Sequence, residues 1–286
     1  MKIGISGASG HFGSSAIREL KQRTAAGNIV AISRSPEKLK SESVEARFGD
    51  YDQPGSLIEA YKGFDCLLII PTSDMRPGQR TIQNVAAIDA AVAAGAEHIV
   101  FLSAGGTRNV AAPSNGASYF AGEQRLIKTA KKWTILRMSY YSESFAQEAM
   151  TSLQHGVLTG IAENRVSFVS REDLAAAAAG MLTTDGHNGA IYSLTGPHAL
   201  SGAERATIVS NVSGKTVNFI TIPAEDLERQ MIQVGLPPEI ARVVIDIQRG
   251  FVNGDFNIVT GDIEKLSGKK PRTLEDVLAT FLNKKS

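Results

Sequence analysis

The fold is decided near the start of the chain, by residues 2–13, KIGISGASGHFG. Residues 2–6 form an apolar run typical of a short buried strand, and residues 12–23 carry apolar side chains at helical spacing. Between them, Gly7, Gly10 and Gly13 form a G-x-x-G-x-x-G loop. Such a loop turns sharply, lets the backbone approach a pyrophosphate, and points free N–H groups of the following helix at the anion. This context predicts a dinucleotide site, and the alternative is a tight turn without a ligand.

The alternation of strand and helix continues through the first half of the chain. We expect further strands at residues 29–33, 44–48, 66–70, 98–102 and 133–136, with helices at 56–61, 81–94 and 120–130 and another that opens at 35–37. Gly95 follows the helix at 81–94, in the place that a helix C-cap favours. Strands that alternate with helices pair in parallel through right-handed crossovers, which predicts an α/β fold of Rossmann type with a doubly wound parallel sheet.

The pattern changes after residue 196. Helical stretches at 203–212, 224–234, 238–249 and 274–281 surround one short strand at 217–220. We therefore expect a Rossmann domain at residues 1–150, to which residues 165–195 return, and a smaller, mainly helical lobe at residues 196–286. Residues 137–160 are expected to contribute to that lobe as well.

The end of the second strand bears on the type of dinucleotide. NAD-specific sites usually hold an acidic residue there, which accepts from the ribose 2′-hydroxyl. This chain instead has Ser33-Arg34-Ser35, with Lys38 one turn further. A guanidinium suits a 2′-phosphate, so the segment predicts NADP(H) as the cofactor, held by Arg34 and Lys38. The alternative for Arg34 is a solvated surface charge.

Further candidate contacts lie in the glycine loop and after the third and fourth strands. Asp50 and Tyr51 follow the third strand, where Asp50 suits either the adenine amino group or a turn. Pro71 and Thr72 follow the fourth strand, over the expected path of a ribose. In the loop itself the candidate cofactor contacts are Gly7, Ser9, Gly10, His11, Phe12 and Gly13.

Composition argues against several classes of partner, with a local basic patch as the open alternative. The 30 basic and 29 acidic side chains give a net charge of +1, which offers no global attraction to nucleic acid or to an anionic membrane. The single cysteine, Cys66, lies in an apolar run and excludes an intrachain disulfide, and the five histidines match no metal-ligand spacing, so no metal is expected. We see no apolar stretch long enough for a membrane span and no signal peptide, and we expect a cytoplasmic protein.

Four pieces of the sequence together resemble a known group: the Gly-Ala-Ser-Gly-x-x-Gly loop, Arg-Ser-Pro-Glu-Lys at 34–38, Gly-Asp-Tyr at 49–51, and Leu-Arg-x-x-x-Tyr-Ser-Glu at 136–143. The chain resembles the NmrA-like atypical short-chain dehydrogenases, and within them the bacterial type 2 NADPH:quinone oxidoreductases and triphenylmethane reductases. That resemblance implies NADPH in a cleft beside a small lobe, with an aromatic or quinonoid acceptor against the nicotinamide. It also implies that Met138, Ser139 and Tyr140 lie by the nicotinamide and that Tyr141 and Phe145 wall the acceptor pocket. The alternative for Tyr140 and Tyr141 is a place as core aromatics at a strand end.

The acid–base pair of ordinary short-chain dehydrogenases is incomplete here. Those enzymes use Tyr-x-x-x-Lys, in which the lysine lowers the pKa of the tyrosine. This chain has Tyr119 followed four residues later by Glu123, and we expect a carboxylate there to raise the pKa of the tyrosine. Ser103 stands where the usual catalytic serine would be, and without the lysine it is interpreted as a cofactor or loop contact.

Reduction of a quinone needs less machinery than oxidation of an alcohol. The acceptor is already electrophilic, so hydride transfer requires close stacking, and protons can come from water. We therefore predict an NADPH-dependent reductase of a small quinone or similar aromatic electrophile. The sequence identifies no catalytic residue, and the candidates are Tyr119 and Tyr141. The alternative is a non-enzymatic NADP(H)-binding redox sensor that regulates partners. The sequence does not determine the oligomeric state, and a homodimer is one possible assembly.

Overall fold

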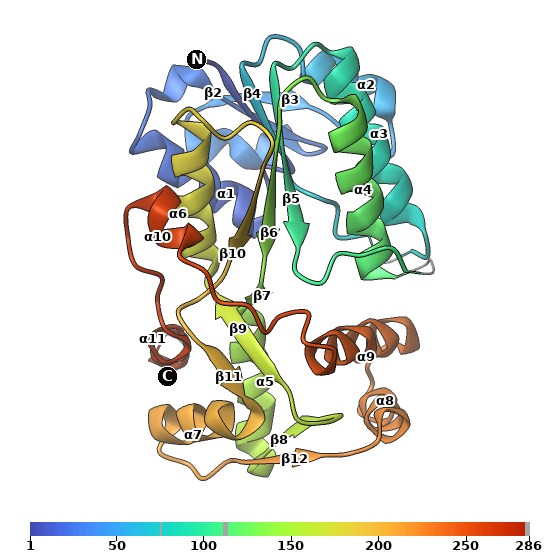
Figure 1. Ribbon diagram of the computed structural model, residues 1–286, viewed down its shortest axis with the longest axis vertical. Coiled ribbons are helices and arrows are strands. Elements are labelled where there is room, and N and C mark those ends of the chain that lie inside the picture. Colours follow the sequence, from blue (N-terminus) through green and yellow to red (C-terminus); the bar gives the residue numbers. More distant parts are fainter. Residues whose placement is uncertain (75, 111–113, 284–286) are drawn as a thin grey trace. The chain divides into compact units, whose positions relative to one another are not determined.

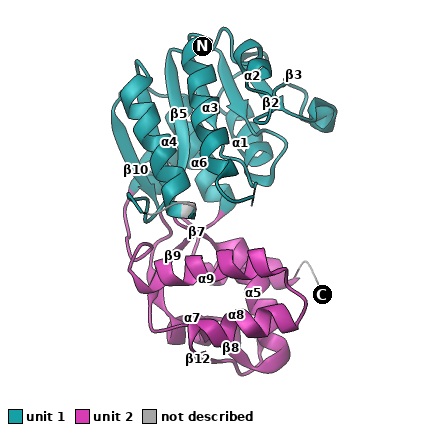
Figure 2. Cartoon of the chain, turned by 90° about the vertical axis from the view of Figure 1, so that its right-hand side faces the viewer, with its two compact units in different colours: residues 1–138, 171–194, 262–269 teal, residues 139–170, 195–261, 270–286 magenta. Residues whose placement is uncertain are grey.

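The computed structural model describes residues 1–74, 76–110 and 114–283. The chain forms two compact units. Unit 1 comprises Met1–Met138, Arg171–Leu194 and Asp262–Lys269, and unit 2 comprises Ser139–Ser170, Thr195–Gly261 and the C-terminal segment from Lys270 (Figure 2). The boundaries differ from those expected from the sequence. The first segment of unit 1 ends at Met138 rather than at residue 150, its second segment begins at Arg171 rather than at residue 165, and Asp262–Lys269 also belongs to unit 1.

Unit 1 is built on a seven-stranded sheet in the order β10-β6-β5-β4-β1-β2-β3. Every neighbouring pair in this sheet is parallel. The strands are β1 (Ile3–Ser6), β2 (Ile29–Ser33), β3 (Glu45–Phe48), β4 (Cys66–Ile69), β5 (His98–Ala104), β6 (Trp133–Met138) and β10 (Ala190–Leu194). The order reverses direction at β1, as in a doubly wound sheet, and the α/β fold of Rossmann type is confirmed.

Helices cover both faces of this sheet (Figure 1). One group contains α2 (Pro54–Ala60), α3 (Gln79–Ala93) and α4 (Asn115–Thr129), and the other contains α1 (His11–Lys21), α6 (Arg171–Leu182) and α10 (Asp262–Ser267). Because both faces are covered, β1, β2 and β4 are fully buried, which explains their nearly continuous apolar sequences. Two helices differ from those expected from the sequence. The segment after Ser35 is a 3-10 helix, η2 (Pro36–Glu42). Helix α4 begins five residues earlier than expected, because the Ser114 side chain caps it.

The alanine run of α6 allows an unusually close contact with α10. A Cβ atom on Gly180 would lie 1.8 Å from the carbonyl oxygen of Leu266 in α10. Helix α10 belongs to unit 1, although the chain on both sides of it belongs to unit 2. Its position is also fixed by Asp262, whose carboxylate accepts from the backbone N–H of Ser193 in β10 at 2.8 Å. The sequence did not predict this return, because α10 is only six residues long.

Unit 2 is less purely helical than expected. It contains a three-stranded sheet, β11-β9-β7, from β7 (Tyr140–Tyr141), β9 (Arg165–Val169) and β11 (Ala199–Ser201), and a parallel pair from β8 (Val157–Gly160) and β12 (Asn218–Thr221). Its helices are α5 (Ser142–His155), α7 (Gly202–Ser213), α8 (Ala224–Gln233), α9 (Pro238–Val252) and α11 (Leu274–Asn283). Residues 165–170, which were expected to return to the Rossmann domain, belong to unit 2 and contain β9. No helix among the described residues is long and apolar enough to cross a membrane.

We expect Gly180→Ala to lower the free energy of unfolding by at least ~1 kcal/mol, because the added methyl group has no space against the backbone of Leu266. Gly55→Ala is the matched control, since Gly55 lies in α2 with nothing within 4 Å of a new Cβ, and it should leave stability unchanged or slightly higher. Urea unfolding of the three proteins measures both effects. Equal stability of Gly180→Ala and the parent chain would contradict the described packing of α6 on α10.

Candidate cofactor site

The glycine loop leaves β1 through a backbone turn that suits glycine. Gly7 has φ +83°, and the N–H groups of Gly7 and Ala8 both donate to the carbonyl of Ile32 in β2, at 3.0 and 3.1 Å. Helix α1 then begins with Gly10 as its N-cap, and within this described segment no side chain caps it and no acidic residue occupies its first turn. A helix N-terminus of this kind attracts an anion through its N–H groups and its dipole.

Gly10 and Gly13 serve different purposes. A Cβ atom on Gly13 would lie 2.6 Å from the carbonyl oxygen of Gly7 and 2.7 Å from that of Ala8, so this glycine lets α1 pack against its own loop. A Cβ atom on Gly10 would meet only the Gly7 carbonyl oxygen, at an ordinary 3.5 Å. The protein itself therefore leaves space at Gly10, as a pyrophosphate-binding loop requires, and the contact of Gly10 with a cofactor remains a prediction.

The end of β2 places several small polar groups beside this loop. The hydroxyls of Ser9 and Ser33 lie 2.8 Å apart, and the Ser33 hydroxyl accepts from the backbone N–H of Ser35 at 3.0 Å. Arg34 and Lys38 are exposed, and neither forms an ion pair with any residue that the structure describes. Their charges are thus available to an anionic ligand. His11 is exposed and Phe12 is buried at the start of α1.

The residues after β3 are held by internal contacts. Tyr51 donates its hydroxyl to the carbonyl of Ile70 at 2.6 Å and lies 3.0 Å from the hydroxyl of Ser6, and burial raises the pKa of Tyr51 to about 12. The Asp50 carboxylate accepts from the backbone N–H of Asp52 at 3.1 Å. The turn that the sequence offered as one alternative for Asp50 is therefore present, and its contact with adenine remains a prediction.

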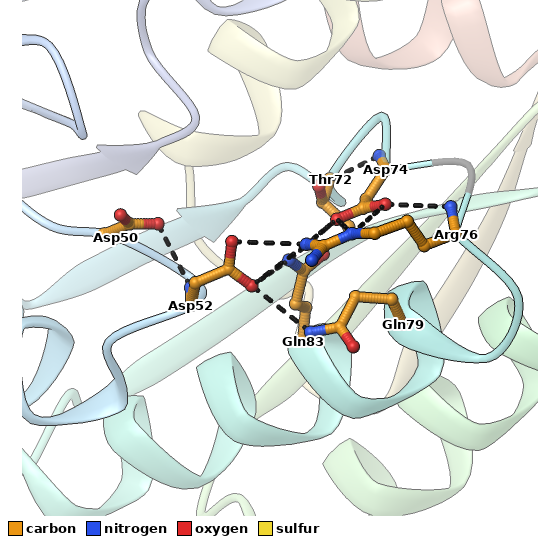
Figure 3. A network of polar contacts seen from close by, with 7 residues as sticks. All are labelled: Asp50, Asp52, Thr72, Asp74, Arg76, Gln79 and Gln83. Atoms are coloured by element: carbon orange, nitrogen blue, oxygen red, sulfur yellow. Dashed lines mark hydrogen bonds and ion pairs between the residues drawn. The ribbon is translucent and has the colours of Figure 1, made fainter.

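A polar network, not anticipated from the sequence, joins the loops after β3 and β4 (Figure 3). Arg76 donates to Asp74 through Nε at 2.9 and 3.0 Å and reaches Asp52 at 3.3 Å, while the buried amide of Gln83 donates to Asp52 at 2.7 Å. Hydrogen bonds from Arg76 lower the pKa of Asp74 to about 2. Thr72 belongs to the same segment, because its hydroxyl accepts from the Asp74 N–H at 3.1 Å. The network ties together the two loops that carry Asp50 and Pro71.

Glu123 is engaged in a way that the sequence did not suggest. It is 1% exposed and accepts from Arg137 twice, from Nε at 2.9 Å and from Nη2 at 2.5 Å. The Ser103 hydroxyl also donates to it, at 2.6 Å, and lies 3.3 Å from Thr107 Oγ1 in the following loop. The loop contact offered for Ser103 is thus present, whereas its contact with the cofactor remains a prediction.

Tyr119 has a raised pKa, but not for the reason expected. Burial of the side chain, which is 9% exposed, raises the pKa, and the Arg80 guanidinium 5.9 Å from the ring centroid opposes that shift. The expectation that Glu123 raises the pKa of Tyr119 is wrong, because the carboxylate of Glu123 is occupied by Arg137 and Ser103.

The residues expected beside the nicotinamide and acceptor lie where the chain passes from unit 1 to unit 2. Met138 ends β6, and its carbonyl accepts from the Gly105 N–H at 2.8 Å. Within unit 2, Ser139 donates to the carbonyl of Ser167, and Tyr140 packs edge to face on Phe251 with ring centroids 5.1 Å apart. Tyr141 is half-buried at the start of α5, and Phe145 is 1% exposed in the core of unit 2. Contacts of these side chains with cofactor or acceptor remain predictions.

Comparison with known proteins places this geometry among nucleotide-dependent reductases. A family model described as NAD(P)H-binding matches residues 7–185. The chain is 32% identical to quinone oxidoreductase 2 of Escherichia coli over 286 residues, which cover 98% of this chain and 99% of that one. It is 25% identical to the NAD(P)H azoreductase of Xenophilus azovorans over 95% of each chain. The structure of the Escherichia coli quinone oxidoreductase with NADPH superimposes with a TM-score of 0.92, at 31% identity over 98% of this chain and all of the other. The triphenylmethane reductase of Citrobacter sp. with NADP(H) gives 0.90, at 28% identity over 98% of this chain and 99% of the other.

The contrast between Gly10 and Gly13 allows a sharp test of the loop. We expect Gly10→Val to weaken NADPH binding at least tenfold, ~1.4 kcal/mol, while the free energy of unfolding changes little, because the protein leaves space there. Gly13→Ala should instead lower the stability of the protein itself. Fluorescence titration and urea unfolding separate the two effects. Tight NADPH binding by a folded Gly10→Val variant would refute the role of the loop.

Proposed function

The chain belongs to the NAD(P)H-binding family, and from this premise we propose that it reduces a quinone or another electrophilic aromatic acceptor with NADPH. It is an NAD(P)H-dependent oxidoreductase of Rossmann type, and the class of acceptor is the proposed part. The observation that carries the proposal is the pairing of Glu123 with Arg137, at the position where an alcohol-oxidising relative needs a lysine. Support for the acceptor comes from relatives named for quinones, azo compounds and triphenylmethane dyes.

The residues present fit NADPH. The N-terminus of α1 and the space at Gly10 suit a pyrophosphate, and Arg34 and Lys38 suit a 2′-phosphate. When bound, the cofactor supplies a hydride. The remaining assignments, Asp50 and Tyr51 to adenine, Pro71 and Thr72 to ribose, and the residues 138–140 to the nicotinamide, are part of the proposal.

We propose that the protein binds and orients the acceptor but does not donate a proton to it. Tyr119 is buried with a raised pKa, and both charges of the Glu123–Arg137 pair are satisfied, so none of the three is suited to exchange protons with a substrate. A quinone accepts hydride once it is held at reacting distance, and water can protonate the product. We propose Tyr141 and Phe145 as the aromatic wall for the acceptor.

The preference for NADPH should depend on Arg34. We expect NADPH to bind at least tenfold more tightly than NADH, ~1.4 kcal/mol, and Arg34→Ala to remove that preference while NADH affinity stays unchanged. Lys21→Ala is the control, since it removes one positive charge at the other end of α1. Fluorescence titration of each protein with both nucleotides gives the affinities. An Arg34→Ala variant that still prefers NADPH tenfold would remove Arg34 from the site.

Turnover separates a reductase from a sensor. With NADPH and a small quinone, and without flavin or metal, the purified protein should oxidise NADPH, and Tyr119→Phe should keep most of the rate. Tyr141→Trp should lower kcat more than it weakens NADPH binding, because it narrows the acceptor site. Tight NADPH binding without oxidation across a varied quinone panel would favour the regulatory function. A collapse of the rate in Tyr119→Phe would show that its hydroxyl supplies a proton.

A further inference from the structure

Arg137, Glu123 and Ser103 form a triad around a buried carboxylate, which the proposed reaction does not use directly. The three residues come from consecutive elements, Ser103 from β5, Glu123 from α4 and Arg137 from β6. Ser103 and Arg137 are also partners in the β5–β6 register. Gly122 allows the close approach of α4, because a Cβ atom there would lie 2.8 Å from the ring of Phe101 in β5. The fold therefore brings Glu123 against the next-to-last residues of both strands.

The strength of the triad comes from the burial of Glu123 and from the geometry of its contacts. A carboxylate that is 1% exposed is costly unless it is paired, and the bidentate contact with a planar guanidinium is a strong and directional pairing. Arg137 cannot rotate without leaving Glu123 uncompensated. Its backbone is held as well, because the next residue, Met138, accepts a hydrogen bond from Gly105 at 2.8 Å.

The triad fixes the position of the C-terminal end of β6, because Arg137 is the next-to-last residue of this strand. Arg137 is followed by Met138, the last residue of unit 1 in this part of the chain, and then by Ser139 and Tyr140. These three residues are the ones proposed to lie beside the nicotinamide. The residues proposed to bind the phosphates, Gly10, Arg34 and Lys38, belong to other parts of the chain than the triad.

We infer that Arg137 is a positioning residue, which acts through the Glu123 contact to set residues 138–140 for hydride transfer. This inference rests on the proposed reductase function and adds to it. Glu123, at the position of the missing lysine, fixes a strand end instead of activating a tyrosine. Loss of the triad should therefore slow the transfer step much more than it weakens NADPH binding.

The decisive comparison is between Arg137→Met and a double variant, Glu123→Gln with Arg137→Met. The single change leaves a buried carboxylate unpaired, so stability should fall, whereas the double change removes both charges and should recover much of it. We expect kcat to fall at least tenfold in both, with the Kd for NADPH changed less than threefold, ~0.65 kcal/mol. Arg137→Lys, which keeps the charge but loses the fork, should give an intermediate kcat. Arg125→Met is the control, because Arg125 lies on the same helix as Glu123 but forms a surface ion pair with Asp89, and its loss should change neither value.

The readouts distinguish positioning from general support of the fold. If the role of Arg137 were purely structural, kcat would recover together with stability in the double variant, and that result would overturn the inference. An unchanged kcat in folded Arg137→Met would overturn it too. The fluorescence of bound NADPH provides a second measure that needs no acceptor. Loss of positioning should change the emission of the nicotinamide when the protein is saturated with NADPH. An unchanged emission in both variants would count against the inference. If the parent protein oxidises no quinone, the proposed function fails, and the emission comparison still decides the role of Arg137.

Discussion

Helix α1 begins in direct contact with the loop that leads into it, and Gly13 leaves no room there for even one methyl group. This contact depends on two hydrogen bonds that hold the loop on Ile32 in the neighbouring strand of the sheet. Together they fix where the uncapped end of α1 points, and hence where an anion can bind. The end of β2 lies beside this loop, through the contact of Ser33 with Ser9, and carries the exposed Arg34 that we propose to select the dinucleotide.

The arginines of unit 1 show how differently similar charged residues can be used. Arg34, like Lys38, is exposed and remains available to a ligand. Arg76 is exposed too, but it is occupied by Asp74 and Asp52 and joins two loops. Arg137 is occupied by a buried carboxylate and joins a strand to a helix. The sequence alone presents these as similar basic residues, and only the partner of each side chain separates a ligand contact from an internal one.

Much of unit 1 could be predicted, because its buried strands are apolar throughout and because the glycine spacing has a specific physical cause. The local structure of the candidate site was predicted where the chain is continuous, in the strand, loop and helix around Gly7–Gly13 and in β2, whereas the cofactor contacts of these residues stay predictions. The contacts were not predicted where partners are distant in sequence. Glu123 was assigned to Tyr119, four residues away, although its partner is Arg137, and the hydrogen bonds that Asp52 accepts from Arg76 and Gln83 follow no motif. Unit 2 was described as mainly helical because β7 and β11 are two and three residues long, too short to leave a pattern.

In the proposed reaction, hydride passes directly from NADPH to an acceptor without a proton-donating residue. Single-turnover oxidation of NADPH deuterated at the transferred position, followed across neutral pH with a small quinone, tests this most directly. We predict a primary isotope effect on quinone-dependent oxidation and a rate that no ionising side chain of the protein controls. A rate without an isotope effect that follows the titration of one protein group would contradict direct transfer.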